Sequence, residues 1–383
     1  MKLLHVLPTL DPNAGGPAES VKQRSALLHR LGHTIEVVTL DGPRDRASAP
    51  FPVPVHVLGP SVGNYRYSRA LIPFLKQHAG EYDAVIVDGV WQYSSFGTWL
   101  ALRHHATPYF VFPHGMLDPW FKDHYPLKHL KKCLYWPWGE YRVLRDARAV
   151  FFTTEEERLR SRQSFSPYRM IEATVSLGTK APPTDSVALG NLFLGRHPEL
   201  AGCRCLLFLG RLHEKKGCDL LIRAFANVHA IDPTLRIIMA GPDQTGWSAY
   251  LQGLAGELGV AEKITWTGML RDDLKWGAFY CSEAFVLPSH QENFGVAVAE
   301  ALGCGRPVLI SDKINIWREI EEDGAGLVAP DTVAGTEYNL RRWLDLGPDR
   351  RALMSMQASA TFERRFTQES MTASLLDRLR EFI

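Results

Sequence analysis

Two glutamates near residue 300 form the pair of side chains in this sequence best suited to binding a polar ligand. Glu292 follows an apolar run that ends at 288–289, and seven residues separate it from Glu300. A helix is expected to open at Phe294 and Gly295, where free backbone N–H groups can bind an anion or sugar oxygens. Glu300, farther along that helix, can accept hydrogen bonds from a diol such as ribose. The competing interpretation is an amphipathic helix with solvated carboxylates.

Two cations occupy a similar position after another apolar run. In GRLHEKKG (210–217), Arg211 follows the end of the expected strand, and Lys216 comes just before an expected helix. A guanidinium and an ammonium beside unpaired N–H groups suit phosphate oxygens. The segment therefore indicates an anion site, with a solvated basic loop as the alternative.

The first half of the chain offers a glycine-rich loop and a histidine. Gly15 and Gly16 lie between an expected strand and helix and would let the backbone approach a ligand closely, although the loop lacks the G-x-G-x-x-G dinucleotide pattern. His114 ends the run YFVFP, which predicts an imidazole at a sheet edge. A tight structural turn and a histidine satisfied within the core are the respective alternatives.

Two series of apolar runs alternate with amphipathic stretches, which predicts two parallel sheets built from βαβ units. We therefore expect an α/β protein with two doubly wound, Rossmann-like domains facing a cleft. The expected boundaries are 1–178, 179–360 and a terminal helix over 361–383 that crosses back to the first domain. The expected strands are 3–8, 33–40, 54–59, 83–89, 109–115 and 148–154, then 205–211, 236–242, 263–269, 284–289 and 307–312.

Composition limits the class of protein. The chain has 383 residues and a formal net charge of +1, which argues against a dedicated nucleic-acid binder. The first residues make a poor signal peptide, and no apolar run reaches the roughly 18 residues that span a bilayer. The six cysteines are scattered, and we expect reduced thiols that bind no metal. A cytoplasmic protein is the expectation.

Several segments together resemble glycosyltransferase family 4 of the GT-B fold, and the resemblance covers nearly the whole chain. Its most specific part is the motif of two glutamates separated by seven residues, which lies downstream of Arg211 and Lys216. The resemblance is carried by the His114-Gly115 pair and by GGPAES (15–20), FFTTEEE (151–157), GRLHEKKG (210–217), MAGP (239–242), TWTGML (265–270) and PSHQENFGVAVAE (288–300).

The resemblance implies a retaining transfer of a hexose from a nucleoside-diphosphate sugar. Arg211 and Lys216 would bind the donor phosphates, and Glu300 the ribose. Glu292 would hold the donor sugar together with the backbone of 293–295, and His114 would lie near the transferred carbon. In the motif, Asn293 stands where the family often has glycine, and His290 receives no role. The loop glycines Gly15 and Gly16 would approach the pyrophosphate or the acceptor from the first domain.

No metal or other cofactor is expected. No two aspartates lie two apart, so the D-x-D metal motif of the other large glycosyltransferase fold is absent, and Arg211 with Lys216 would supply the positive charge. A nucleotide-sugar epimerase of GT-B-like fold and a catalytically silent nucleotide-sugar-binding partner are the alternatives. An NAD-dependent oxidoreductase is disfavoured because neither half has the glycine fingerprint.

The segment 120–148 interleaves basic and aromatic residues. It holds seven Lys or Arg against three acids, together with several Trp and Tyr. Such a pattern on helical segments suits an anionic membrane surface, although the aromatic residues can also belong to a core. If the segment binds a membrane, the acceptor would be a lipid-linked glycan at the inner face of the cytoplasmic membrane, as in surface-polysaccharide synthesis.

Overall fold

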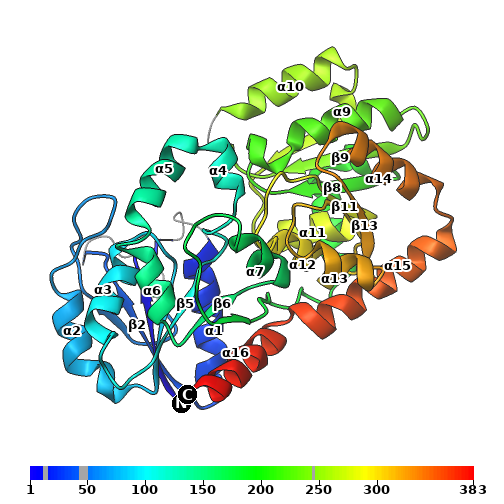
Figure 1. Ribbon diagram of the computed structural model, residues 1–383. Coiled ribbons are helices and arrows are strands. Elements are labelled where there is room, and N and C mark those ends of the chain that lie inside the picture. The colour runs from blue at the N-terminus through cyan, green and yellow to red at the C-terminus, as the bar shows by residue number, and fades with distance from the viewer. Residues whose placement is uncertain (12–15, 43–50, 244–245) are drawn as a thin grey trace. The chain divides into compact units, whose positions relative to one another are not determined.

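The computed structural model describes residues 1–11, 16–42, 51–243 and 246–383, and these divide into two compact units (Figure 1). Unit 1 comprises Met1–Leu177 with Gln368–Ile383, and unit 2 comprises Gly178–Thr367. The terminal segment that returns to unit 1 thus begins at Gln368, whereas the sequence placed its start at 361. Residues 362–366 form a π-helical turn that belongs to unit 2, because Phe362 and Phe366 are buried there.

Unit 1 is built on a seven-stranded parallel sheet in the order β3-β2-β1-β4-β5-β6-β7. Chain order reverses direction on the two sides of β1, which is the doubly wound arrangement expected from the sequence. The strands are β1 (Lys2–Leu7), β2 (Thr34–Thr39), β3 (Val55–Val57), β4 (Ala84–Asp88), β5 (Tyr109–Phe112), β6 (Ala149–Phe152) and β7 (Glu172–Thr174).

The helices of unit 1 connect these strands, and the last one comes from the end of the chain. The carboxyl-terminal helix lies beside the first helix (Figure 1). The helices are α1 (Gly16–Arg30), α2 (Leu71–His78), α3 (Tyr93–Leu102), α4 (Trp120–His124), α5 (Pro126–Tyr135), α6 (Glu140–Asp146), α7 (Glu155–Ser161) and α16 (Gln368–Phe382).

Unit 2 has a six-stranded parallel sheet in the order β10-β9-β8-β11-β12-β13. Its strands are β8 (Arg204–Leu209), β9 (Leu235–Ala240), β10 (Ile264–Gly268), β11 (Ala284–Leu287), β12 (Val308–Ser311) and β13 (Gly326–Ala329). Its helices are α8 (Ser186–Arg196), α9 (Cys218–Val228), α10 (Trp247–Glu257), α11 (Asp272–Cys281), α12 (Val296–Gly303), α13 (Trp317–Glu322), α14 (Val333–Asp345) and α15 (Pro348–Thr361).

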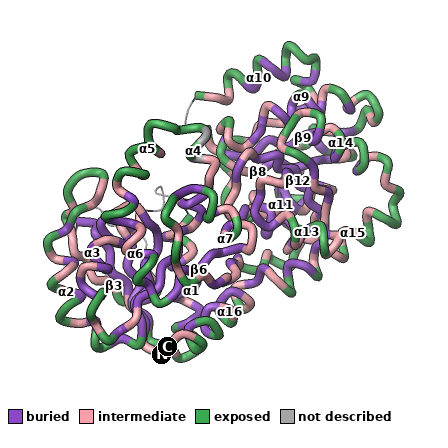
Figure 2. The backbone as a smooth tube through the Cα atoms, viewed as in Figure 1, coloured by how far each residue is buried: buried purple, intermediate pink, exposed green. Residues whose placement is uncertain are grey.

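The strands of both sheets form the cores of their units (Figure 2). Central strands such as β4 (AVIVD) and β11 (AFVL) are largely apolar because helices cover both faces of a doubly wound sheet. One face of the unit 1 sheet packs against α1 and α16, where Val21 and Leu28 share a core cluster with Leu375 and Leu379. Helices α1 and α16, which are far apart in the sequence, therefore contribute to the same core.

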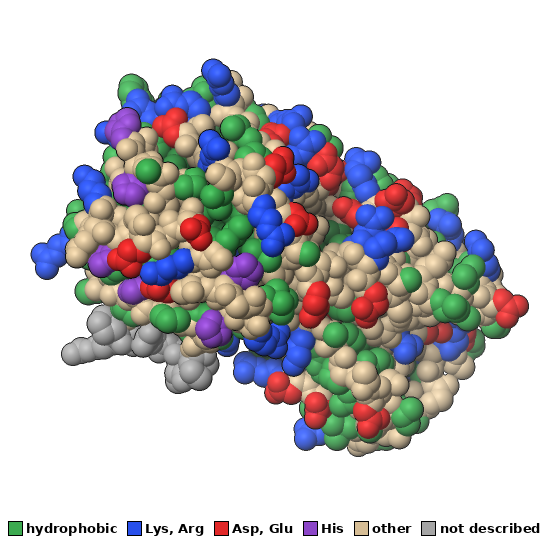
Figure 3. All heavy atoms as spheres, turned by 90° about the horizontal axis from the view of Figure 1, so that it is seen from below, with side chains coloured by type: hydrophobic (Ala, Val, Ile, Leu, Met, Phe, Trp, Pro, Cys, Tyr) green, Lys and Arg blue, Asp and Glu red, His purple; other side chains and the backbone are tan. Residues whose placement is uncertain are grey.

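Acidic and basic side chains are interspersed on the face of the molecule drawn in Figure 3. This mixture fits the formal net charge of +1 and gives that face no single-sign field. Among the described residues, no helix combines the length and apolar composition that crossing a membrane requires.

Candidate functional site

The loop after β8 packs closely against the ends of two neighbouring strands of unit 2. Gly217 has a φ of +66°, and a Cβ there would lie 2.2 Å from the carbonyl oxygen of Pro288. Gly241, after β9, has a φ of +146°, and its Cβ would lie 1.7 Å from the carbonyl oxygen of Gly210. Only glycine fits at both positions. The close approach brings the loops that carry Arg211, Lys216 and Glu292 to one sheet edge.

Lys216 and Glu292 form an ion pair between the loops after β8 and β11. The Lys216 Nζ contacts Glu292 Oε2, and the two side chains are only 14% and 22% exposed. Burial lowers the pKa of Lys216, and the charges of Lys215 and Arg211 lower it further. The Glu292 carboxylate acts in the opposite direction, because it favours the charged ammonium. An incoming anion would therefore meet a cation already paired within the protein.

The Glu292 loop is fixed by main-chain bonds to the loop after β12. The Glu292 N–H donates to the Lys313 carbonyl at 3.0 Å, and the Asn315 N–H donates to the Glu292 carbonyl at 3.0 Å. The Asn315 amide also donates to Asn293 Oδ1 at 3.3 Å. Glu292 thus forms a parallel bridge with Ile314, and the Asn293 side chain contacts the same loop.

The helix expected near Phe294 begins one residue after Gly295. Gly295 is the N-cap of α12 with a φ of +75°, so the backbone turns there in a conformation that favours glycine. The Phe294 side chain is buried and meets Phe366 edge to face, with ring centroids 5.7 Å apart. Only the backbone of Phe294 is therefore available for a polar ligand.

Glu300 is buried on α12 and paired with a lysine from α11. The Lys275 Nζ donates to Glu300 Oε1 at 2.7 Å, whereas Oε2 makes no hydrogen bond to the described residues. Burial raises the pKa of Glu300, and the nearby Lys275 charge opposes that shift. Glu300 is thus buried beside a partner and not solvated, and one oxygen is left to accept a hydrogen bond.

Two residues near the site have roles that sequence reasoning missed. Lys275 lies in an amphipathic stretch, and no motif marks it as the partner of Glu300. His290 Nδ1 lies 2.8 Å from Asp331 Oδ2, and this contact ties the Glu292 loop to the segment after β13. In both cases the partners are distant in sequence, and only the packing of α11 and β13 brings them together.

In unit 1, His114 lies in the turn after β5 and contacts a buried carboxylate. The Nε2 atom of His114 is 3.1 Å from Asp88 Oδ1, and Asp88 is the last residue of β4. The same carboxylate binds His5 on β1 and Arg24 on α1. The alternative of a histidine satisfied by core partners thus holds for Nε2 alone, because Nδ1 makes no hydrogen bond to the described residues.

A second buried carboxylate fixes the same turn. Glu157 Oε1 accepts a hydrogen bond from the Gly115 N–H at 2.6 Å, and its Oε2 accepts two from Thr153. Glu157 is the last glutamate of the segment FFTTEEE, so this motif residue supports the turn after β5. Of the two loop glycines, Gly16 is exposed at the start of α1, and Gly15 lies outside the described residues.

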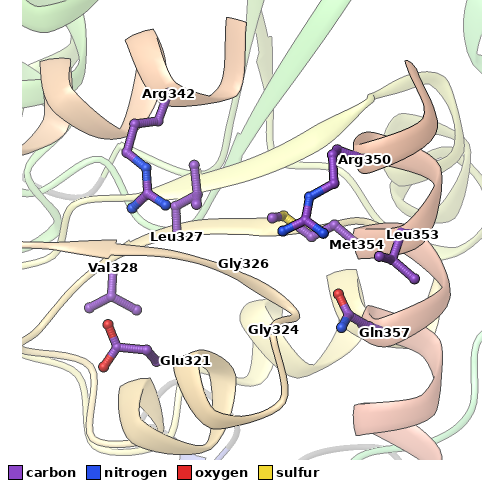
Figure 4. A pocket seen from close by; sticks show the side chains of 10 residues that line it. All are labelled: Glu321, Gly324, Gly326, Leu327, Val328, Arg342, Arg350, Leu353, Met354 and Gln357. Atoms are coloured by element: carbon purple, nitrogen blue, oxygen red, sulfur yellow. The ribbon is translucent and has the colours of Figure 1, made fainter. Parts of the chain in front are cut away.

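A pocket of about 250 Å³ lies between β13, α14 and α15 of unit 2 (Figure 4). Arg342 and Arg350 point toward it from α14 and α15, respectively. Its lining contains no residue that the sequence predicted for the site, so it is separate from the Lys216, Glu292 and Glu300 cluster. The lining residues are Glu321, Gly324, Gly326, Leu327, Val328, Arg342, Arg350, Leu353, Met354 and Gln357.

Two family models match the chain, one in each half. Residues 197–358 match the family described as "Glycosyl transferases group 1", and residues 15–173 match the "Glycosyl transferase 4-like domain". The chain belongs to the GT4-type glycosyltransferases. The GT-B fold and the transferase activity expected from the sequence are thereby confirmed.

Relatives and solved structures agree with this family. A D-inositol 3-phosphate glycosyltransferase from Mycobacterium sp. (strain JLS) is 26% identical to this glycosyltransferase over 392 residues, covering 94% of this chain and 85% of the relative. A sucrose-phosphate synthase from Thermosynechococcus elongatus has a TM-score of 0.78 at 17% identity, with 100% and 99% of the two chains covered. Anabaena HepE in complex with UDP and glucose has a TM-score of 0.75 at 17% identity, with 99% of each chain covered. The structural likenesses show the fold.

Removing either cation of the loop after β8 should slow the glycosyltransferase. If these cations bind the leaving phosphate as the sequence predicts, Arg211→Ala and Lys216→Ala each remove charge that stabilises it, and we expect kcat to fall by about 10²-fold or more. Arg223→Ala removes an exposed cation from α9 and is the matched control. Steady-state kinetics with wild-type rates in Arg211→Ala or Lys216→Ala would contradict the assignment.

Glu300 should affect donor affinity rather than proton transfer. Glu300→Gln keeps part of the hydrogen bonding, so we expect donor KM to rise with little change in kcat. Because the pKa of Glu300 is raised, wild-type donor KM should also rise on acidification at a higher pH than for an ordinary glutamate. Glu300→Gln lacks this component.

Initial rates between about pH 8 and about pH 5.5, the range above the ordinary pKa of glutamate, measure both effects. Glu321→Gln, which changes a carboxylate outside the cluster, is the control. A pure loss of kcat in Glu300→Gln with unchanged KM would assign Glu300 to proton transfer instead.

Proposed function

We propose that this glycosyltransferase transfers a hexose, with retention at the anomeric carbon, from a nucleoside-diphosphate sugar to a hydroxyl of a lipid-linked glycan. The observation that carries the donor part is the cluster in unit 2. Arg211 and Lys216 lie in the loop after β8, Glu292 in the loop after β11 and Glu300 on the helix α12 that follows, so all four come after strand ends at the carboxyl edge of one sheet. Parallel α/β sheets bind ligands at that edge. The likeness to Anabaena HepE, whose solved complex contains UDP and glucose, supports a donor of this class.

Each residue of the cluster fits one part of such a donor. Arg211 and Lys216 would neutralise the diphosphate, while the Glu300 Oε2 would accept a hydrogen bond from ribose. Glu292 and the backbone N–H groups of residues 293–295 would bind the hexose. On donor binding, the Lys216–Glu292 ion pair would break. Lys216 would then contact the phosphate, and Glu292 would contact the sugar.

Bond cleavage would need no protein base in this proposal. The C–O bond between the hexose and the diphosphate breaks, and the leaving phosphate accepts the proton of the attacking hydroxyl on the face that it vacates. Arg211 and Lys216 stabilise the negative charge that grows on the phosphate. We propose that the chain's own cations supply this charge without a metal ion or other cofactor, in keeping with the absence of a D-x-D motif from the sequence.

A donor screen followed by a turnover assay tests this function. A nucleotide sugar at 100 times its Kd should stabilise the fold by about 2.7 kcal/mol, measurable as a rise in Tm. Release of the free nucleoside diphosphate should then require a glycan acceptor. Interconversion of the nucleotide sugar without an acceptor would identify an epimerase, and binding without turnover would identify a silent binding protein.

Helix α5 supports the lipid-linked part of the proposal. Leu127, Leu130 and Leu134 follow one another at helical spacing and are 57–78% exposed, and Trp138 just beyond the helix is 69% exposed. No residue of α5 is buried. A row of neighbouring apolar side chains that are all this exposed is typical of an interaction surface.

The aromatic residues of 120–148 divide into two groups. Trp136 is fully buried, stacks on Phe165 and donates to the Pro167 carbonyl at 2.8 Å, so it belongs to the core. The Tyr135 hydroxyl bonds the Tyr65 hydroxyl at 2.6 Å. Trp138 remains on the surface. Trp136 therefore belongs to the core, the partly exposed Tyr135 is anchored to Tyr65, and Trp138 with the exposed leucines of α5 remains available for a surface contact.

Cations flank the exposed stripe. Lys128 and Lys131 are exposed on α5, whereas Lys132 turns toward the protein, with Nζ 4.5 Å from the centre of the Trp91 ring. Burial lowers the pKa of Lys132 to about 8. We propose that the leucines insert among lipid headgroups while Lys128 and Lys131 contact anionic phosphates, at the inner face of the cytoplasmic membrane.

Vesicle sedimentation tests this surface. Near an anionic surface each lysine contributes about 1 kcal/mol, so Lys128→Glu with Lys131→Glu should weaken binding to phosphatidylglycerol vesicles by about tenfold or more. Changing Leu127, Leu130 and Leu134 together to Ser should weaken binding at every salt concentration. Arg69→Glu with Lys76→Glu, which changes exposed cations at α2, is the matched control. Equal recovery of all variants, or no binding by the wild type, would leave a soluble acceptor as the better interpretation.

A further inference from the structure

Four side chains from four elements of unit 1 meet in one buried cluster. Asp88 at the end of β4 is at its centre, with Oδ2 2.7 Å from His5 Nδ1 and Oδ1 2.8 Å from Arg24 Nη2. His114 Nε2 is 3.1 Å from the same Oδ1. The side chains of Asp88, His5 and Arg24 are 0% exposed, and that of His114 is 6% exposed.

Asp88 is ionised in this cluster. Burial alone would raise the pKa of Asp88, but the Arg24 charge and the hydrogen bonds from His114 and His5 hold it well below its ordinary value. Burial lowers the pKa of His5, which leaves Arg24 as the cation that balances Asp88. An ionised carboxylate can only accept hydrogen bonds. The Nε2 atom of His114 must therefore carry the proton in this contact.

This contact decides which nitrogen His114 presents to a ligand. In a neutral imidazole one nitrogen donates and the other accepts, and the partner of the first fixes the role of the second. With the proton on Nε2, the Nδ1 atom is an acceptor, and it makes no hydrogen bond to the described residues. A substrate group that meets Nδ1 must then be a donor, such as a sugar hydroxyl.

Neighbouring residues also fix the position of the His114 ring and the conformation of its backbone. The Phe112 and His114 rings stack with centroids 5.5 Å apart at 20°, and the Arg24 guanidinium lies 4.6 Å from the centre of the Phe112 ring. His114 has a φ of 50°, a left-handed conformation that is costly for a non-glycine residue. Asp88 on one side and the Glu157–Gly115 bond on the other maintain that turn.

From this geometry we propose that Asp88 is a positioning residue of the glycosyltransferase: it holds His114 in the Nε2–H form, so that Nδ1 accepts a hydrogen bond from a hydroxyl of the sugar substrate. The substrate part rests on the proposed function. The tautomer part does not, because it concerns the protein without substrate.

The tautomer can be measured by NMR of protein labelled with ¹⁵N-histidine at about pH 8, above the ordinary pKa of histidine. The chain has 14 histidines, so the signal that disappears in His114→Ala identifies His114. We expect a pyrrole-like Nε2 and a pyridine-like Nδ1 in the wild type. A wild-type His114 with its proton on Nδ1 would overturn the proposal.

Two substitutions at Asp88 separate its acceptor role from its charge. Asp88→Leu removes the acceptor, and His114 should then populate both tautomers. Asp88→Asn keeps one side-chain oxygen. Because Arg24 can only donate hydrogen bonds, it should keep that oxygen on the side that Arg24 shares with His114, and the Nε2–H form should persist. An unchanged His114 signal in Asp88→Leu would show that Asp88 does not set the tautomer.

Arg24 supplies a second variant in case Asp88→Leu does not fold, since that change leaves a buried guanidinium without its counter-charge. Arg24→Met with Asp88→Leu removes both charges together, and Arg24→Met alone keeps the Asp88 carboxylate. The double variant should lose the tautomer preference that the single variant retains. Equal signals in the two variants would overturn the proposal.

Kinetics then connect the tautomer to the reaction, with UDP release from UDP-glucose as the probe. Asp88→Leu should lower kcat by about tenfold or more, but the same change made in His114→Ala should have less than about a twofold effect, because Asp88 acts through His114. Glu172→Gln, which alters a paired carboxylate on β7 away from His114, is the matched control. Independent, multiplicative losses would contradict positioning. No UDP release by the wild type would count against the donor alone, and the NMR result would still decide the role of Asp88.

Discussion

Every named strand in the two sheets runs parallel to its neighbours, and the rest of the structure follows from that constraint. Parallel strands need crossover connections, so helices cover both faces and every loop that follows a strand emerges at the same edge. The candidate site residues lie at this edge because of the parallel arrangement. Asp88 is the last residue of β4 and His114 follows β5, while Arg211 follows β8 and Glu292 follows β11. Residues far apart in the chain thereby become neighbours without any local sequence signal.

Charge pairing is the second constraint, because a buried ion without a partner is costly. The structure meets it by giving each important charge a partner: Lys216 with Glu292, Lys275 with Glu300, and Asp88 with Arg24. The first two pairs have a partly exposed side, so a ligand can rearrange them. The third is fully enclosed and can only support. In our proposals the partly exposed pairs meet the substrate, and the enclosed pair acts through its neighbour His114.

The sequence was sufficient for features that depend on local pattern. Apolar runs located eleven of the thirteen strands in the part of the chain that the structure describes, including β4 and β8, because strands buried on both faces leave largely apolar segments. It missed β7, which has one apolar residue among three, and β13, a four-residue apolar strand that is no shorter than the located strand β5. The motifs marked Lys216, Glu292 and Glu300 as candidate site residues, but they did not mark Lys275, the partner of Glu300, or Asp88, the partner of His114. Those contacts depend on the order of the strands in the sheet and on which helix face is buried, and no single sequence segment predicts either.

Unit 1 is assembled from two stretches of chain, and this has a consequence for biosynthesis. Leu375, Leu376 and Leu379 of α16 belong to the same core cluster as Val21 and Leu28 of α1. A ribosome delivers α1 before α16, with all of unit 2 between them. The apolar face of α1 that α16 covers therefore stays open to water and to chaperones until unit 2 has been translated, and a nascent chain truncated before Gln368 would never close it.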